Sequence, residues 1–312
     1  MVRLIVQRFM QLLLLLLGIS FLVFMSMHIA PGDPATIIGG PNATESDLEA
    51  IRESLGLNQP VLVQYVDYLA GLFQGDLGYS YQTKQAVSDA IVSRFPATIK
   101  LATASMIVAI IIGVIAGMVS ARKQNSWLDV TSTTFALAGV SIPNFWLGAM
   151  LILIFSVNLQ VLPVGGLNSP FYTVDGIKEL ILPAITLGTA SAALIARMTR
   201  SSMLEVIRSD YIRTARAKGV RKHSLIWIHA LKNAMIPVIT VIGINFGGLL
   251  GGTIITEQVF AINGIGRLMI DAIAARDFPV VQGTVLLVAG IFVFVNLVVD
   301  VIYALIDPRI SY

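Results

Sequence analysis

The stretch LATASMIVAIIIGVIAGMVSARK, residues 101–123, decides what kind of protein this is. It carries no charge from Leu101 to Ala121 and then ends on Arg122 and Lys123. A helix needs about 20 mostly apolar residues to cross the hydrocarbon core of a membrane, and this run is long enough. Basic residues directly after such a run favour the cytoplasmic side. We therefore expect a membrane-spanning helix that ends in the cytoplasm.

The whole chain repeats this pattern. Of its 312 residues, 56% are hydrophobic and only 12% are charged, and its mean hydropathy is +0.82. Soluble domains carry about 25% charged residues, so the composition is that of an integral membrane protein. Uncharged runs predict an all-α membrane protein with six transmembrane helices. They lie at 9–31, 101–121, 132–157, 180–196, 233–256 and 278–299.

The distribution of Lys and Arg predicts the orientation of these helices. If both termini are cytoplasmic, 14 of the 21 Lys and Arg residues fall in cytoplasmic segments, nine of them between residues 197 and 232. Cytoplasmic loops carry such an excess of basic residues. We expect cytoplasmic termini and a multi-pass protein. Because the net charge is only +3, the composition does not point to a nucleic-acid partner.

The longest segment predicted outside the membrane, residues 32–98, should be helical. Ser46 and Glu49 have the spacing of a capping box before a helix at 47–55, and Gly56 suits the position after its end. A second helix is expected at 60–73, with an apolar stripe of Leu62, Tyr65, Val66, Leu69 and Phe73. Both helices are too short to span, so we expect them on the membrane surface or against the outer ends of the spans.

The search for enzyme chemistry is negative. The sequence holds no GxxxxGK[ST] phosphate loop, no GxSxG and no HExxH, and its three histidines lack metal-ligand spacing. The absence of cysteine excludes thiolate metal sites and cysteine nucleophiles. We therefore expect no catalytic residues, no metal site and no cofactor bound by this chain.

The fifth predicted span is rich in glycine. Gly243, Gly247 and Gly251 recur at every fourth residue, a spacing that lets two helix backbones approach closely in a membrane. Plain helix packing and the wall of a transport pathway are both open interpretations. Asn245 is the strongly polar residue there, and either faces such a pathway or hydrogen-bonds a neighbouring helix.

The segment SDYIRTARAKGVRKHSLIWIHALKNA, residues 209–234, is the most basic part of the chain. Its pattern reads as a short helix, a break at Gly219 and a second amphipathic helix from Ser224 with Leu225, Ile228 and Leu231 on one face. A topology anchor would need only the charge. The ordered pattern instead favours a shaped knob that fits a cleft on a cytoplasmic partner.

Distinctive motifs occur along nearly the whole chain. They are PGDP (31–34), LGLNQPVLVQY (55–65), GDLGYS (75–80), ILPAITLG (181–188), RMTRSSMLEV (197–206), YIRTARAKGVRKHSLIWIHALKNAMIPVIT (211–240) and DPRI (307–310). Together they resemble one family, the permeases of binding-protein-dependent ABC importers in the dipeptide, oligopeptide, nickel and glutathione group. Arg213, Thr214 and Ala215 stand where the wider superfamily has Glu-Ala-Ala, and Gly219 matches its glycine.

The resemblance implies a division of labour. This chain would be the transmembrane subunit of an importer for peptides or a peptide-like solute in the bacterial inner membrane. Its partners would be a second homologous permease subunit, two cytoplasmic ABC ATPases that bind ATP and Mg²⁺, an extracytoplasmic substrate-binding protein and membrane lipid. Residues 1–98 would form the first span with the outer segment, and 99–312 a five-helix core with a coupling loop at 199–233. The implied ATPase-coupling residues are Asp210, Tyr211, Arg213, Thr214, Ala215, Arg216, Ala217, Lys218 and Gly219.

Two other functions stay open on the residues alone. An ion-gradient-driven carrier or channel would transport solute without an ATPase. An insertase-type or structural membrane protein would use the basic loop to bind a different partner. Spans without a centrally placed carboxylate argue against a proton-driven carrier, since ionisable residues in the middle of a span mark such pathways.

Overall fold

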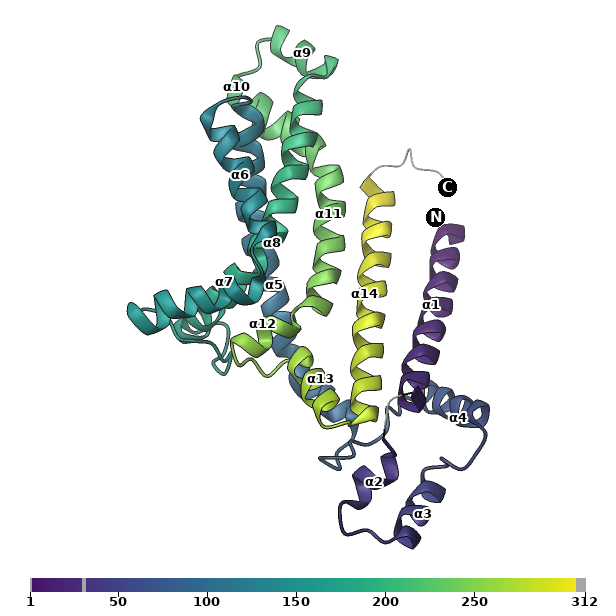
Figure 1. The fold of residues 1–312 in the computed structure, drawn as a ribbon. Helices are drawn as coiled ribbons and strands as arrows, with labels where there is room; N and C mark the ends of the chain where they lie inside the picture. The colour runs from purple at the N-terminus through teal and green to yellow at the C-terminus, as the bar shows by residue number, and fades with distance from the viewer. Residues whose placement is uncertain (1, 30–31, 307–312) are drawn as a thin grey trace.

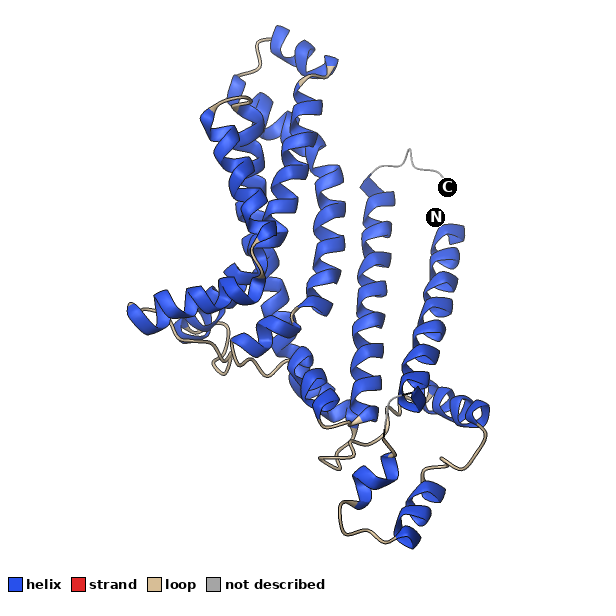
Figure 2. Cartoon of the chain, in the orientation of Figure 1, coloured by secondary structure: helices blue, strands red, loops and turns tan. Residues whose placement is uncertain are grey.

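The structure is a computed structural model that describes residues 2–29 and 32–306, so the DPRI motif at 307–310 lies outside the described residues. The described chain is helical throughout, as predicted, with loops between the helices (Figures 1 and 2). The elements are α1 (Val2–Ile29), α2 (Pro34–Gly39), α3 (Glu45–Ser54), α4 (Val61–Phe73), α5 (Val87–Arg122), α6 (Trp127–Ser141), α7 (Asn144–Leu151), the π-helix η1 (Ile152–Asn158), α8 (Val174–Ile207), α9 (Asp210–Ala217), α10 (Lys222–Ser224), the π-helix η2 (Leu225–Ala230), α11 (Leu231–Gly252), α12 (Ile254–Val259), α13 (Ile265–Ala274) and α14 (Phe278–Ile306).

Five helices in the described ranges are long and apolar enough to cross a membrane, at or around five of the six predicted spans. They are α1, α5, α8, the η2–α11 unit and α14. At 1.5 Å per residue the 36 residues of α5 extend about 54 Å, which exceeds the roughly 30 Å hydrocarbon core. The additional length precedes the uncharged run at 101–121, so we expect the start of α5, from Val87, to lie outside the membrane.

The third predicted span, 132–157, is wrong as a single straight helix. α6 ends at Ser141, and the following α7–η1 unit runs at 102° to it. The break is at Pro143, because proline has no N–H to donate and drives the residue before it out of helical geometry. Ile142 is indeed extended, with φ −81° and ψ 124°. The pair counts as a sixth span only if it is taken as one broken helix.

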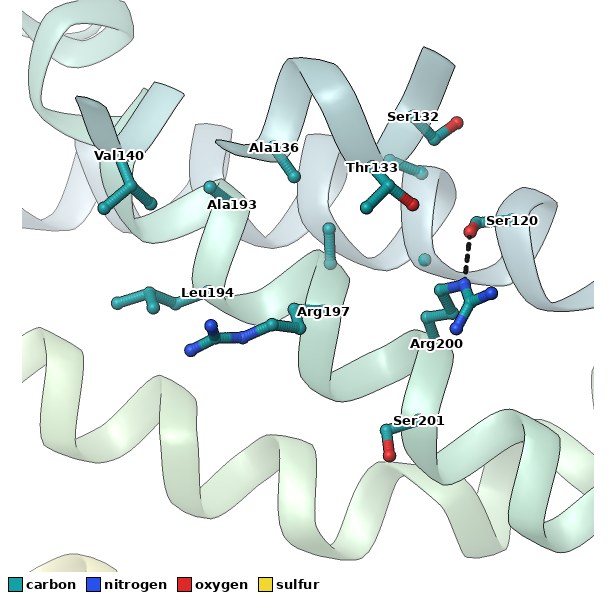
Figure 3. A pocket seen from close by; sticks show the side chains of 13 residues that line it. Ser120, Ser132, Thr133, Ala136, Val140, Ala193, Leu194, Arg197, Arg200 and Ser201 are labelled. Carbon is teal, nitrogen blue, oxygen red and sulfur yellow. Dashed lines mark hydrogen bonds between the residues drawn. The ribbon is translucent and has the colours of Figure 1, made fainter. Parts of the chain in front are cut away.

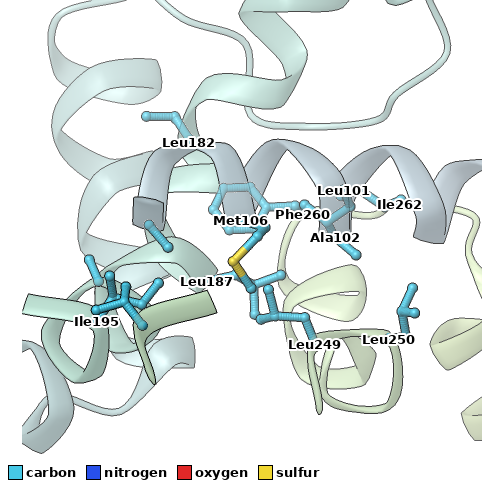
Figure 4. Close-up of a cluster of buried hydrophobic side chains, with 13 residues drawn as sticks. Leu101, Ala102, Met106, Leu182, Leu187, Ile195, Leu249, Leu250, Phe260 and Ile262 are labelled. Atoms are coloured by element: carbon cyan, nitrogen blue, oxygen red, sulfur yellow. The ribbon is translucent and has the colours of Figure 1, made fainter. Parts of the chain in front are cut away.

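The centre of the molecule is a close contact between α5 and α8. A Cβ atom added to Gly113 would lie 2.7 Å from the Ala192 carbonyl oxygen, and one on Gly117 would lie 2.5 Å from that of Ala196. Only glycine therefore permits this backbone approach, in the manner of small residues at membrane helix contacts. Buried side chains from α5, α8, α11 and the loop after α12 surround the contact (Figure 4).

The outer segment is helical as predicted, but its capping box lies two residues earlier. Thr44 caps α3, its hydroxyl accepting from the Asp47 N–H at 3.3 Å, and an Asp47 carboxylate oxygen accepts from the Thr44 N–H at 2.9 Å. Thr44 has the hydroxyl directly before the helix. Asp47, three residues later, takes the role in the capping box that was predicted for Glu49. Gly56 has φ +67° and ends the helix as expected.

An ion cluster centred on Arg52 ties this segment together. Arg52 reaches Asp33 at 2.7 Å, Glu45 at 2.9 Å and Glu49 at 3.0 Å. Hydrogen bonds from Arg52, then from Asn58, hold the pKa of Glu49 below its usual range. Because Asp33 also caps α2 by accepting from the Ala35 N–H, the cluster joins α2 to α3.

α4 packs across the outer end of α1. Tyr65 lies 5.3 Å from the rings of both Phe21 and Phe24, and its hydroxyl is 2.9 Å from that of Ser20. The predicted apolar stripe is therefore divided: Tyr65 faces α1, whereas Leu62 is 76% exposed. The exposed half is directed away from the protein, as a helix on a membrane surface requires.

The outer end of the bundle also contains a fully buried carboxylate. Glu257 accepts hydrogen bonds from the Thr98 hydroxyl at 2.7 Å and the Arg267 N–H at 3.0 Å, and the Ile265 N–H donates to Thr98 at 2.9 Å. Thr98 and Glu257 thus accept from two backbone N–H groups in the first turn of α13, where the N-cap residue Gly264 has no side chain to do so. A negative charge at a helix N-terminus is also favourable.

Figure 1 places α9 at the same end as the beginning of α1 and the end of α14, with α2, α3 and α4 at the other end. This arrangement agrees with termini and basic loop on one side, whereas the assignment of that side to the cytoplasm stays a prediction. The expected division at residues 98 and 99 falls inside the unbroken α5 and also stays a prediction.

Candidate functional site

The basic loop folds into a compact knob, defined here as residues 209–220, between the ends of α8 and α11 (Figure 1). Ser209 is extended, with φ −69° and ψ 154°, and turns the chain out of α8. α9 then runs for eight residues from Asp210 to Ala217. Asp210 in its first turn and Arg216 in its last complement the helix dipole.

Gly219 forms the predicted break after this helix. Its φ is +81°, a left-handed conformation that residues with a Cβ rarely adopt. The Gly219 N–H donates to the Arg216 carbonyl at 3.0 Å, and the Val220 N–H donates to that of Ala215 at 3.2 Å. The turn is thus fully hydrogen-bonded, and the chain leaves it in a fixed direction toward α10.

The inner face of α9 anchors the knob to the bundle. Ile212 is 1% exposed and belongs to an apolar cluster contributed by α5, α8, α9, η2 and α11. Complete burial of such a side chain contributes about 1.5–3 kcal/mol. Its partners in the cluster are Met118, Ala121, Met203, Leu225, Ala230 and Ala234.

A second anchor joins α9 to the start of α11. The Tyr211 hydroxyl accepts a hydrogen bond from the Asn233 side-chain amide at 2.7 Å and donates to the His229 carbonyl at 3.3 Å. The two segments are 22 residues apart in sequence. Because Tyr211 and Ile212 both hold α9 to the bundle, we expect the helix to move with the bundle rather than independently.

The outer face of α9 is exposed and mainly cationic. Arg213 pairs with Asp210 at 3.0 Å, but both side chains remain more than 70% exposed. An exposed pair of this kind contributes little to stability, so the face is available to a partner. Ala215 is half buried against the cluster below. The remaining exposed members of the predicted set are Thr214, Arg216, Ala217, Lys218 and Gly219.

The face predicted for the second helix of the loop is wrong at Ile228, whereas Leu225 and Leu231 pack on the apolar cluster. Leu225 is 3% exposed as expected, but Ile228, three residues later, is 61% exposed. The cause is η2, a π-helix whose hydrogen bonds span five residues rather than four and thereby shift the side chains that follow. Ala230 takes the buried position instead, at 1% exposure.

Sequence reasoning missed an ion pair just inside the knob. Asp129, which is 4% exposed in the first turn of α6, binds the Arg200 guanidinium of α8 through both carboxylate oxygens at 2.8 Å. Ser120 of α5 bonds to both side chains, and the Asn125 N–H donates to Asp129 at 2.9 Å. This clamp joins α5, α6 and α8, and Figure 3 shows Arg200 turned toward Ser120.

The glycine stripe of α11 lies against α14. A Cβ added at Gly243 would meet Val299 at 2.1 Å, one at Gly247 would meet Phe292 at 3.2 Å, and one at Gly251 would meet a valine at 3.3 Å. The Asn245 amide donates to the Val241 carbonyl of its own helix at 2.8 Å. These contacts are helix packing, and a role of these residues in a pathway stays a prediction.

Comparison with known proteins identifies the chain. Residues 109–312 match the family described as binding-protein-dependent transport system inner membrane component, and residues 1–102 match the N-terminal region that accompanies it. The chain belongs to this family. The dipeptide transport system permease protein DppB of Alkalihalophilus pseudofirmus is 48% identical over 98% of both chains. The glutathione transport system permease protein GsiC of Escherichia coli is 45% identical over the full length of both.

A solved structure shares the fold. The MetNI methionine ABC transporter in an inward-facing conformation matches with a TM-score of 0.59 and 19% identity, over 70% of this chain and 96% of that chain. The family confirms the resemblance read from the motifs: this is a multi-pass permease subunit of an ABC importer in the bacterial inner membrane. In this family ATP hydrolysis belongs to a partner subunit, and substrate arrives on a binding protein.

Proposed function

We propose that the importer carries dipeptides or a small peptide-like solute such as glutathione. The names of these two relatives support this, since dipeptides and glutathione share peptide bonds and free carboxylates. The identity to these relatives runs along the full chain and so includes the transmembrane helices. Any selection of the solute by the permease would occur in those helices.

The assembly we propose contains this chain, a second similar permease, two cytoplasmic ATPases that bind ATP and Mg²⁺, and an extracytoplasmic binding protein. The knob at residues 209–220 is the contact with an ATPase. The observation that supports this is its construction: an exposed cationic face with Arg213 and Lys218 stands on a base fixed by Ile212 and Tyr211. A lever must be accessible at its tip and rigid at its base.

The mechanism follows from that construction. ATP binding changes the relative positions of the ATPases, and a groove that holds α9 moves the helix with it. Since Ile212 and Tyr211 couple α9 to α8 and α11, the spans must follow. ATP drives transport only if it binds the two arrangements of the spans with different affinities.

The decisive experiment is reconstitution of the purified assembly in liposomes. We expect uptake of a labelled dipeptide to require both ATP and the loaded binding protein, and we expect that loaded protein to stimulate ATP hydrolysis. Substituting glutathione for the dipeptide identifies which solute is carried. Accumulation of solute by this chain alone, driven by an ion gradient, would refute the proposal.

A further inference from the structure

A cavity of about 420 Å³ lies between α5, α6 and α8, and Ser120 and Arg200 of the Asp129–Arg200 clamp form part of its wall (Figure 3). Its size falls within the roughly 300–1,000 Å³ of sites that hold small molecules. Most of its wall is made of small side chains, which keep it open. These are Ala116, Gly117, Ala136, Ala193, Ala196 and Ser132.

Two arginines line the cavity, and they differ in whether an acidic residue pairs with them. Arg200 is neutralised by Asp129, as described above. Arg197, one turn earlier on α8, is exposed and makes no hydrogen bond or ion pair with any residue in the part of the chain that the structure describes. Figure 3 shows the two side chains pointing apart, with the Arg197 guanidinium beside Leu194 and away from Ser201.

The Arg197 side chain is directed away from the knob. Helical side chains point back toward the start of their helix, and α8 begins at the end of the molecule opposite the knob. The guanidinium therefore lies further from the knob than its own Cα atom does. If the knob is cytoplasmic as predicted, the charge is turned toward the membrane core and not toward the surface, where long basic side chains usually place it. An unpaired guanidinium in a spanning helix needs water or an anion beside it.

The exposed face of α8 around Arg197 is polar as well. α8 is the most buried of the five spanning helices of the described chain, with 61% of its apolar window inside the protein. Yet Arg197, Ser201 and Glu205, spaced four residues apart on one face, are all exposed. Ionisable residues in spans face water-filled cavities or the bundle interior rather than lipid. This polar face therefore suits an aqueous space better than lipid.

We propose that the cavity is an anion subsite of the transport pathway, in which the Arg197 guanidinium binds a carboxylate of the transported peptide. The inference rests on the proposed function. Its planar guanidinium matches a carboxylate through two parallel hydrogen bonds. A single cation also suits a transport site, because the bound solute must leave again.

The first test uses the absence of cysteine from the chain, which lets one introduced thiol report on the cavity without background. We place Ser201→Cys in the complete importer and compare its rates of reaction with anionic and cationic methanethiosulfonates, each normalised to a free thiol. We expect the anionic reagent to react about tenfold faster, because a fixed cation raises the local concentration of anions.

Arg197→Gln added to Ser201→Cys should abolish this preference, and Arg197→Lys should keep it. Lys178→Gln is the matched control, since it removes the same charge from the outer end of α8, away from the cavity. A thiol that reacts with neither water-soluble reagent would place this face against lipid or the second permease and overturn the proposal. An anionic preference that survives Arg197→Gln would also overturn it.

The second test is transport. In liposomes, Arg197→Gln should lower uptake of a free-acid dipeptide about tenfold, the effect expected of one lost charge-assisted pair. Arg197→Lys should retain most of the uptake, and the loaded binding protein should still stimulate ATP hydrolysis in both. Equal uptake by wild type and Arg197→Gln refutes this inference alone. Failure of the wild-type importer to carry any peptide refutes the proposed function instead.

Discussion

Gly219 offers the sharpest test of the knob, because its role is conformational and its surroundings are empty. Its φ of +81° lies in the left-handed region, and a Cβ atom added there would have no heavy atom within 4 Å. A substitution therefore acts on the backbone alone within this chain. We expect the effect to follow the conformational preference of the new residue rather than its size.

The magnitude follows from the cost of the left-handed conformation. An ordinary L-residue loses about 1–2 kcal/mol there, which changes the ratio of the native turn to its alternatives about 5–30-fold. Asparagine tolerates this region, and a β-branched residue is a strong outlier in it. The expected order of damage at Gly219 is therefore Asn least, Ala intermediate and Val greatest.

The assay is the number of ATP molecules hydrolysed for each peptide taken up by the reconstituted importer. Gly219→Val should raise this number by weakening the link between the ATPase and the spans, while the protein still inserts and assembles. Gly219→Asn should remain close to wild type. Normal coupling in Gly219→Val would refute the role of the turn. Equal damage from Asn and Val would show that any side chain at this position is harmful. Since nothing in this chain lies close to it, the obstruction would then come from the ATPase.

Three further predictions address the supports around the knob and the outer segment. Asp129→Asn leaves the Arg200 charge without its partner and should lower the stability of the complex by about 3 kcal/mol; adding Arg200→Gln should recover part of the loss in a thermal melt. Ile212→Ala should cost about 2–5 kcal/mol locally, measured as faster hydrogen exchange in α9 with its exposed face unchanged. The third concerns pH. Arg52 lowers the folded pKa of Glu49, so this carboxylate stabilises α3 above its unfolded pKa of about 4.3, and the contribution is lost as the pH falls through the lowered value. Arg52→Gln should therefore reduce the acid dependence of exchange in α3 after correction for intrinsic rates.

The sequence predicted the knob because its determinants are local. A helix of eight residues, a left-handed glycine and a basic surface all occur within a few residues of one another. The face of the next helix was wrong because a π-helix is not visible in a regular spacing of apolar residues. Only Ala230, the small residue that occupies the buried position, hinted at the shift.

The features that could not be predicted join distant parts of the chain. Asp129 and Arg200 are 71 residues apart, and Thr98 and Glu257 are 159 apart. A single sequence does not show which of these residues pair. Polar and charged residues are common at the edges of apolar runs, so none of the four stands out. The break in the third span was different: Pro143 is a local signal that an uncharged run of this length concealed.

α8 lines the cavity and leads directly into the knob, and this arrangement gives the Asp129–Arg200 clamp a function in the transport cycle. Arg197 and Arg200 lie one turn apart on α8, and α8 continues within two residues to the start of α9. Because Asp129 ties α6 to α8 at Arg200, the α6 wall of the cavity is fixed to the helix that leads into the knob. We therefore expect a movement of α9 to displace the cavity as a unit, rather than to open it by separating α6 from α8. Such a displacement should make thiol reactivity in Ser201→Cys depend on ATP. In Asp129→Asn, α6 can separate from α8, so this ATP dependence should be smaller, while the anionic preference due to Arg197 remains.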